Sequence, residues 1–426
     1  MKTSSHAARA GPKARRQVGK TAALLLTAAL IVGTGLFNSL GAATAEAGSG
    51  ILVAMLIGGL IALLTGISAA QVGVNYPDEG GAFIWLRRFG YPVLSFIAGC
   101  SYLFKGILGA GVLALGFANY SAQIFSGLPI SLTASVALIV VAAVNTFGIA
   151  PTSRILISIF FINLIPLGLY VAFALPHVRV EYLTPILGRD IVGVLSGAAV
   201  FFWTWDGFQR TAIMANEIKD PRKSIPLAIV GGIAIAAVIY LLVAGATLGV
   251  LGPDAMGRGD TPIIAAAVMV IAGWGGWMIL ASAWMAGFSE TLGDLLSTSR
   301  VGHSMGQAHE LPHWLGAVHK QFQSPHRVLA LLAVVGVVLV NLVPLRQLLP
   351  VASACTLVWY AATNFAALRL EKKQRFAWPV VSWLGIASCV GIFFSLPLWS
   401  IAATAGMLGL LTGARWLLLR TRRKRA

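Results

Sequence analysis

Charged residues are scarce in this chain of 426 residues. They make up 11% of the sequence, against 58% hydrophobic residues, whereas a soluble domain carries about 25% charged residues. Acidic residues are the scarcer of the two charged classes, with 14 Asp and Glu against 31 Lys and Arg. Most of the chain therefore cannot face water, and no polar stretch is long enough to fold as a separate soluble domain.

Cysteine is rare as well, and several catalytic patterns are missing. Cys100, Cys355 and Cys389 lie in apolar segments without metal-ligand spacing, which is typical of small buried side chains. The histidines between His303 and His326 have no compact zinc spacing. No GxxxxGK[ST] phosphate loop occurs, so nothing supports an ATP-driven pump. We expect no enzymatic activity, no metal and no cofactor.

Long apolar runs recur along the whole chain instead. Runs of about 20 apolar residues are the signature of membrane-spanning helices. The first follows a basic tail and contains internal glycines, so we interpret it as a retained span and not as a cleaved signal peptide. Twelve spans are predicted near residues 21–41, 50–73, 93–118, 131–148, 152–175, 191–216, 226–250, 268–298, 328–344, 348–368, 378–396 and 398–416.

The distribution of Lys and Arg predicts the orientation in the membrane. With the N-terminus in the cytoplasm and twelve alternating spans, 26 of the 31 basic residues fall on the cytoplasmic side and four on the external side. Cytoplasmic loops carry such an excess of positive charge. We therefore predict a multi-pass protein of the cytoplasmic (inner) membrane with both termini inside. The basic tails, residues 1–20 and 417–426, are expected to contact anionic lipid and not nucleic acid.

Two of the predicted spans contain residues that interrupt a helix. The first carries Gly33-Thr34-Gly35, and the sixth carries Asp206-Gly207 after four residues rich in aromatics. Irregular backbone survives at membrane depth only where it is buried or lines a cavity. The second break lies five spans after the first. Because five is an odd number, a second unit of five spans must insert in the membrane with the opposite orientation, as in many secondary transporters. The repeats would be residues 21–175 and 191–368, with 378–416 outside them. Tight helix packing is the alternative explanation for the first glycine pair.

Four motifs, in order, resemble those of one family. They are Gly33-Thr34-Gly35, the stretch from Tyr76-Pro77 to Gly90, the stretch from Gly207-Phe208 to Pro226, and the segment from Ser299-Arg300 to Pro325. Over nearly its full length the chain resembles the amino acid–polyamine–organocation superfamily of permeases. The resemblance implies an all-α fold of the leucine-transporter type, a five-plus-five inverted repeat with broken helices 1 and 6, and transport by alternating access.

The resemblance also implies a substrate site. In such permeases the helix 1 loop holds the substrate carboxylate, and the unwound part of helix 6 holds the amine and supplies an aromatic gate. By position, the implied site residues are Gly33, Thr34, Gly35, Phe202, Trp203, Thr204, Trp205, Asp206 and Gly207. The chain departs from the family at Asn163, where many proton-coupled members have lysine, and at Lys105, where cationic amino-acid carriers often have glutamate.

Ionisable residues inside predicted spans are costly and usually face the protein interior. Lys105 and Asp206 fall near mid-depth, and we expect a charge pair or proton relay near the substrate. A purely structural pair or a solvated side chain is the alternative. Glu290 and Asp294 are four residues apart and share a helix face, which resembles a site for a proton or sodium ion. The alternative is a pair of hydrated acids beside an exit vestibule. Lys105, Asp206, Glu290 and Asn163 are the candidate coupling residues.

The sequence thus predicts a secondary transporter that moves amino acids, driven by protons or by exchange. A polyamine or other organocation permease is the alternative within the class, and a non-transporting membrane regulator is the alternative outside it. The expected partners are a small amino acid or amine and the lipid bilayer, with the chain as a monomer or homodimer.

Overall fold

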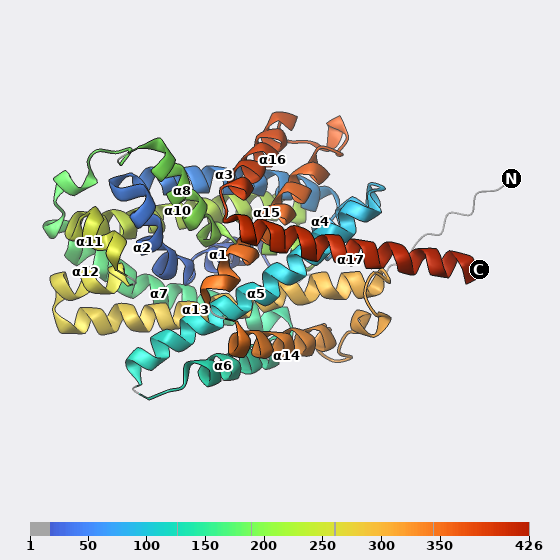
Figure 1. Ribbon diagram of the computed structural model, residues 1–426, viewed down its shortest axis with the longest axis horizontal. Coiled ribbons are helices and arrows are strands. Elements are labelled where there is room, and N and C mark those ends of the chain that lie inside the picture. The colour runs from blue at the N-terminus through green and yellow to red at the C-terminus, as the bar shows by residue number, and fades with distance from the viewer. Residues whose placement is uncertain (1–17, 126, 189, 260, 344, 426) are drawn as a thin grey trace.

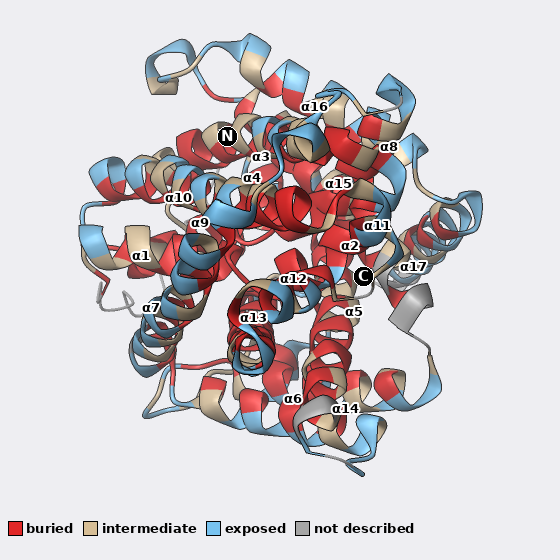
Figure 2. Ribbon diagram, turned by 90° about the vertical axis from the view of Figure 1, so that its left-hand side faces the viewer, coloured by how far each residue is buried: buried red, intermediate tan, exposed pale blue. Residues whose placement is uncertain are grey.

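The chain folds as a bundle of helices. A computed structural model describes residues 18–425 except 126, 189, 260 and 344. Within this part, all regular structure is helical apart from an isolated β-bridge between Val18 and Ile218. The longest helices follow the long axis of the molecule (Figure 1). Viewed along that axis, the inward helix faces are buried and the outward faces are exposed (Figure 2).

The first half of the chain begins with an interrupted helix. Three residues separate the first two helices, and five more helices follow: α1 (Lys20–Ile31), α2 (Gly35–Ala47), α3 (Ile51–Asn75), α4 (Ala82–Arg88), α5 (Pro92–Ile124), α6 (Ile130–Thr146) and α7 (Ile149–Ala174). The short α4 occupies a stretch that the sequence assigned to a connection. Gly80 and Gly81 precede it with φ of 111° and 53°, a left-handed turn that glycine adopts without steric cost.

The second half contains the other predicted interruption. Helix α8 (Ile191–Phe201) passes into a 3₁₀ turn, η4 (Phe202–Trp205), and the chain resumes as α9 (Phe208–Ile213) and the 3₁₀ turn η5 (Ala215–Glu217). The remaining helices are α10 (Pro221–Leu251), α11 (Pro253–Arg258), α12 (Pro262–Ile271), α13 (Gly273–Gln307), α14 (His326–Leu342), α15 (Leu345–Ala367), α16 (Pro379–Phe394) and α17 (Leu398–Arg425).

One predicted span needs correction. The sequence predicted a single helix over 268–298, but Ala272 has φ of 60° and separates α12 from α13. The apolar run continues across this point, so hydropathy does not reveal the break. At 1.5 Å per residue the 35 residues of α13 extend about 50 Å, more than the roughly 30 Å hydrocarbon core of a bilayer. Helix α13 therefore continues beyond the membrane at one end.

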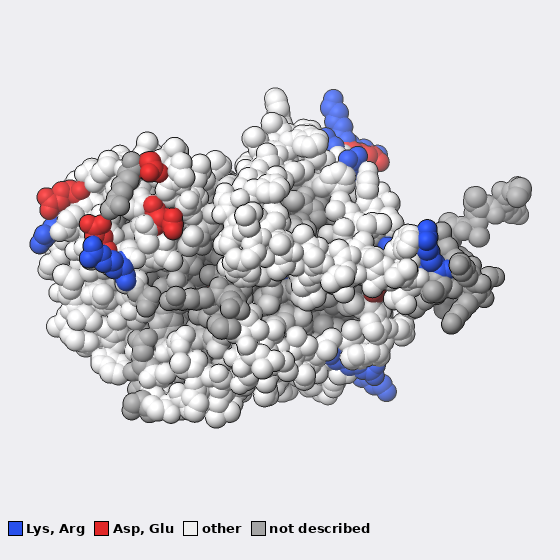
Figure 3. All heavy atoms as spheres, viewed as in Figure 1, with Lys and Arg blue, Asp and Glu red and all other residues white. Residues whose placement is uncertain are grey.

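The surface fits a lipid environment. Large apolar side chains are exposed on the outer helices, among them Trp378, Leu398 and Leu410. Among the residues that the structure describes, six helical segments are long and apolar enough to cross a membrane, and α17 is the least buried of them. On the face shown in Figure 3, charged side chains gather toward the two ends of the long axis. The fold is thus that of an all-helical membrane protein.

Several connections meet at one end of the bundle. Glu310, after α13, accepts hydrogen bonds from Arg87 of α4 and Arg415 of α17 at 2.6 and 2.7 Å. Close to the start of α1, Val18 donates its amide to the carbonyl of Glu217 and accepts from the amide of Lys219. These contacts join segments that the predicted topology assigns to the same side of the membrane.

Candidate functional site

The interruption between α1 and α2 holds a carboxylate. The backbone leaves the helix at Val32 and re-enters it at Gly35. The amide and hydroxyl of Thr34 both donate to Oε2 of Glu290 on α13, at 2.7 and 2.9 Å. A Cβ atom on Gly33 would lie 2.2 Å from the same oxygen. A side chain at this position would have to displace Glu290, because its carboxylate fills the space above the broken backbone.

The interruption of the sixth span packs directly against the first. After η4, Asp206 is extended and Gly207 has φ of 126°, and a Cβ on Gly207 would lie 2.1 Å from the carbonyl oxygen of Leu30. A Cβ on Gly35 would lie 2.9 Å from Cα of Thr204. The two broken segments are thus in backbone contact, and glycines allow that approach.

A tyrosine stabilises both breaks at once. The Tyr240 hydroxyl of α10 donates to the carbonyl oxygens of Ile31 and Thr204, at 2.7 and 3.0 Å. These carbonyls belong to helix ends whose acceptors have lost their regular partners. Because buried backbone groups are expensive to leave unpaired, Tyr240 is a structural support of the candidate site.

Beside the breaks lies a buried network of two cations and two carboxylates. Nζ of Lys105 on α5 is 2.6 Å from Asp206 and 2.5 Å from Asp294 of α13. Arg210 of α9 contacts the same two carboxylates at 3.0 and 3.1 Å. All four side chains are at most 4% exposed. The structure thus brings together Lys105 and Asp206 as the sequence predicted, and the network is electrically neutral.

Arg210 is the member that the sequence analysis missed. Arg210 falls close to the predicted end of the sixth span, 191–216, and the sequence predicted no role for it. The structure places it inside the bundle, where it also donates to the carbonyl of Leu30 at 3.1 Å. Its position four residues after Asp206 was the available signal, since such pairs share one helix face. The hydroxyl of Tyr360 completes the surroundings of Asp206 at 2.7 Å.

The other predicted site residues have separate environments. Asp294 belongs to the network, whereas Glu290 makes no ion pair among the described residues and bonds to Thr34. The two acids of this helix face therefore have different partners. Asn163 on α7 is buried and accepts from Ser282 at 3.3 Å, so the structure does not bring it to Lys105.

The aromatic residues of η4 point in different directions. The Trp203 ring lies 5.7 Å from Nζ of Lys105, and Phe202 packs edge-on against Tyr360. Trp205 packs edge-on against Tyr240 and contacts the glycines of α3. The Thr204 hydroxyl is buried and has no hydrogen-bond partner among the described residues. The site therefore retains an unused polar group next to the helix 1 break.

A second charged cluster lies at the end of the bundle where Val18 meets Glu217. Arg300 of α13 donates to Glu217 at 2.8 Å. Glu79, in the connection before α4, lies close to both charges, and burial raises its pKa to about 7. The Arg300 guanidinium opposes that shift, and the Glu217 carboxylate adds to it. Glu79 can therefore change its charge near neutral pH.

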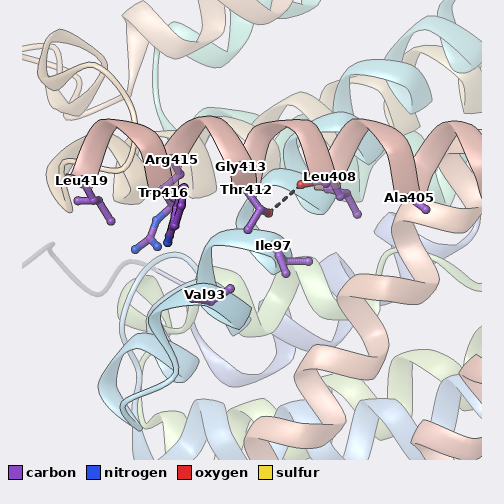
Figure 4. A pocket seen from close by; sticks show the side chains of 10 residues that line it. Val93, Ile97, Ala405, Leu408, Thr412, Gly413, Arg415, Trp416 and Leu419 are labelled. Atoms are coloured by element: carbon purple, nitrogen blue, oxygen red, sulfur yellow. Dashed lines mark hydrogen bonds between the residues drawn. The ribbon is translucent and has the colours of Figure 1, made fainter. Parts of the chain in front are cut away.

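A surface groove is separate from these charges. It lies between α5 and α17 and is lined mainly by apolar residues such as Val93, Ile97 and Leu408, with glycines at 409 and 413 (Figure 4). Its lining contains none of the predicted site residues. The groove faces outward on the least buried apolar helix, so we assign it to the lipid-facing surface.

Comparisons with known proteins agree with this architecture. The sequence pattern of the family described as "Amino acid permease" matches residues 19–411. An uncharacterized transporter of Mycobacterium tuberculosis is 29% identical, over 93% of this chain and 89% of the relative. The branched-chain amino acid permease BcaP of Bacillus subtilis is 25% identical over 86% of this chain and 84% of its own length. The serine/threonine exchanger SteT of the same organism is 25% identical over 90% of both chains. The chain belongs to the amino acid permease family, a family of membrane transporters.

Proposed function

We propose that the chain is a secondary carrier that moves a small amine-bearing solute across the cytoplasmic membrane by alternating access. Amino acids are the class that relatives such as BcaP and SteT indicate, and polyamines or other organic cations are the alternative. The observation that carries the proposal is the backbone contact between the two helix breaks, at Gly207 against Leu30 and Gly35 against Thr204. Broken helices that meet inside a bundle expose the backbone dipoles that carriers use to hold solutes.

The proposed topology follows the charge distribution of the sequence. Both termini would be cytoplasmic, repeats 21–175 and 191–368 would form the inverted core, and 378–416 would pack outside it. The ion pairs of Glu310 with Arg87 and Arg415 support a shared cytoplasmic end. Rocking of one repeat against the other would then open the breaks to either side.

The energy source is proposed to be a proton gradient or exchange. Lys105 and Asp206 would act as a relay only if their ion pair opens during transport, because in this arrangement each is already matched by an opposite charge. Asn163 would leave helix 5 without a titratable group at that position. Exchange of one solute for another needs no proton relay, so both mechanisms stay within the proposal.

Uptake into proteoliposomes tests the proposal. The purified full-length chain is reconstituted and supplied with labelled leucine, serine, arginine, putrescine and isoamylamine, with and without an inward proton gradient, and with the solute preloaded for exchange. We expect saturable uptake of at least one solute, unchanged when choline replaces sodium. Gly207→Ala should abolish uptake, because its Cβ meets the Leu30 carbonyl, whereas Gly391→Ala, whose Cβ meets open space, should not. Absence of uptake of every solute by monodisperse protein would reject the proposal.

A further inference from the structure

The hydrogen-bond donors of the helix 1 break already bond to a carboxylate of the chain itself. The amide and the hydroxyl of Thr34 both donate hydrogen bonds to Oε2 of Glu290. Glu290 is 3% exposed and comes from α13, 256 residues away in the sequence. We propose that Glu290 stands in for the carboxylate of a substrate, so that the ligand of this carrier is a small organic monoamine without a carboxylate. This inference rests on the proposed carrier function and specifies its substrate class.

The position of the Glu290 side chain supports the assignment. Oε2 and Cδ of Glu290 lie 2.2 and 2.5 Å from the position of a Cβ on Gly33. The face of the broken backbone above Gly33 is thus filled, and the Thr34 donors are engaged. A substrate carboxylate could reach them only by displacing Glu290, which would then be buried without its hydrogen bonds. Burying a charge without such partners is strongly unfavourable.

The balance of buried charge points the same way. Lys105 and Arg210 are matched by Asp206 and Asp294, which leaves Glu290 as the one acidic side chain beside the breaks without a cationic partner within the described part of the chain. A zwitterion would add a second carboxylate next to Glu290, where like charges repel in a poorly solvated interior. A monoamine cation would instead pair with Glu290, so that each carboxylate beside the breaks would have a cationic partner.

The ammonium group also finds an acceptor on the other break. The Thr204 hydroxyl is 1% exposed and has no partner among the described residues, and its residue contacts Gly35. An ammonium donates three hydrogen bonds. Glu290 of α13, which is bonded to the helix 1 break, and Thr204 of the other break both offer it an acceptor. The apolar remainder of the ligand would contact the aromatic side chains of η4.

Matched pairs of ligands isolate the contribution of the carboxylate. Leucine and isoamylamine differ only by that group, as do phenylalanine and phenethylamine. The test measures the apparent unfolding temperature of the purified full-length chain, and uptake into proteoliposomes, with each member of both pairs. A ligand that binds the folded state raises the unfolding temperature with its concentration. We expect the amines to stabilise the protein and to be transported, and the paired amino acids to do neither.

Variants of Glu290 separate binding from structure. Glu290→Gln should weaken amine binding about ten-fold or more, the effect of one charge-assisted hydrogen bond. Glu290→Ala frees the Thr34 amide and should allow leucine to bind. Glu181→Gln changes an exposed acid and should alter neither. If a Glu290 variant fails to fold, the comparison of paired ligands on the native chain still decides.

Three outcomes are distinguishable. Transport of amines in preference to amino acids supports the inference. Transport of leucine or phenylalanine in preference to the paired amine overturns it and leaves the carrier function standing. If no member of either pair, and none of the other labelled solutes, is bound or transported, both the carrier function and the inference are rejected.

Discussion

The buried network can be tested by changing its charge balance one residue at a time. Arg210→Met removes a guanidinium that contacts two carboxylates and leaves Asp206 and Asp294 with Lys105 alone. Asp294→Asn removes the opposite charge and leaves two cations with Asp206. The double variant keeps Lys105 and Asp206, whose atoms lie 2.6 Å apart, so neutrality is restored.

The magnitude follows from burial. Removing one partner of a buried ion pair costs about 3–5 kcal/mol, because the remaining charge stays uncompensated. Each single variant should lose stability in this range, since the side chains of the network are at most 4% exposed. The double variant should lose less than the sum of the two, by about 1–3 kcal/mol, because residues in one network are coupled.

The assay is the apparent unfolding temperature in one detergent at one heating rate, because large membrane proteins often unfold irreversibly. Arg258→Met on α11 is the matched control, since Arg258 is exposed. We expect the control variant to lose the least stability. The double variant should lose more than the control, but less than the sum of the losses of the two single variants. Single variants as stable as the control, or a double variant that shows the full sum, would refute a charge-balanced network.

Three further predictions concern the breaks and the charged end. Gly33→Ala should lower stability by about 3–5 kcal/mol, because its Cβ displaces the Glu290 carboxylate and breaks the two hydrogen bonds that this carboxylate accepts from Thr34. The loss of stability should be smaller in a Glu290→Ala background, which unfolding temperatures measure. Tyr240→Phe should cost about 1–3 kcal/mol by leaving buried carbonyls unpaired, measured in the same way. Because the pKa of Glu79 is raised to about 7 in the folded chain, stability should fall as pH rises from 4.5 toward 7, and Glu79→Gln should remove that fall.

Each of these has a contradicting result. An equal effect of Gly33→Ala with and without Glu290 would deny the contact between them, and Gly391→Ala provides the control for alanine in open space. A Tyr240→Phe variant as stable as the native chain would show that other groups satisfy the two carbonyls. A pH profile unchanged by Glu79→Gln would remove Glu79 as a titrating group in this range.

The sequence pattern predicted the features that depend on local chemistry. Glycines inside apolar runs indicate where a helix breaks, and both interruptions occur at those residues. Lysine and aspartate at mid-depth in different spans have few alternatives to pairing, and Lys105 and Asp206 do pair. The family resemblance on four motifs agrees with the family match over residues 19–411.

Features that depend on distant packing were not predicted. The bond from Thr34 to Glu290 joins residues 256 positions apart, and no periodicity encodes it. Arg210 lies near a span boundary, where residue counting cannot separate an interior cation from a loop cation. The break at Ala272 lies inside a continuous apolar run, so the hydropathy pattern does not indicate it. The substrate roles of the nine residues around the breaks stay predictions.

The central claim is that the meeting point of the two breaks holds the transported solute. It is tested most directly by a high-resolution electron cryo-microscopy structure of the full-length chain in a lipid nanodisc, saturated with the amine that stabilises it most. We predict density for one small molecule between the backbone at residues 32–35 and residues 202–207, in contact with Glu290. Ligand density elsewhere in the bundle, or α1 and α8 continuing unbroken through these residues, would contradict the account.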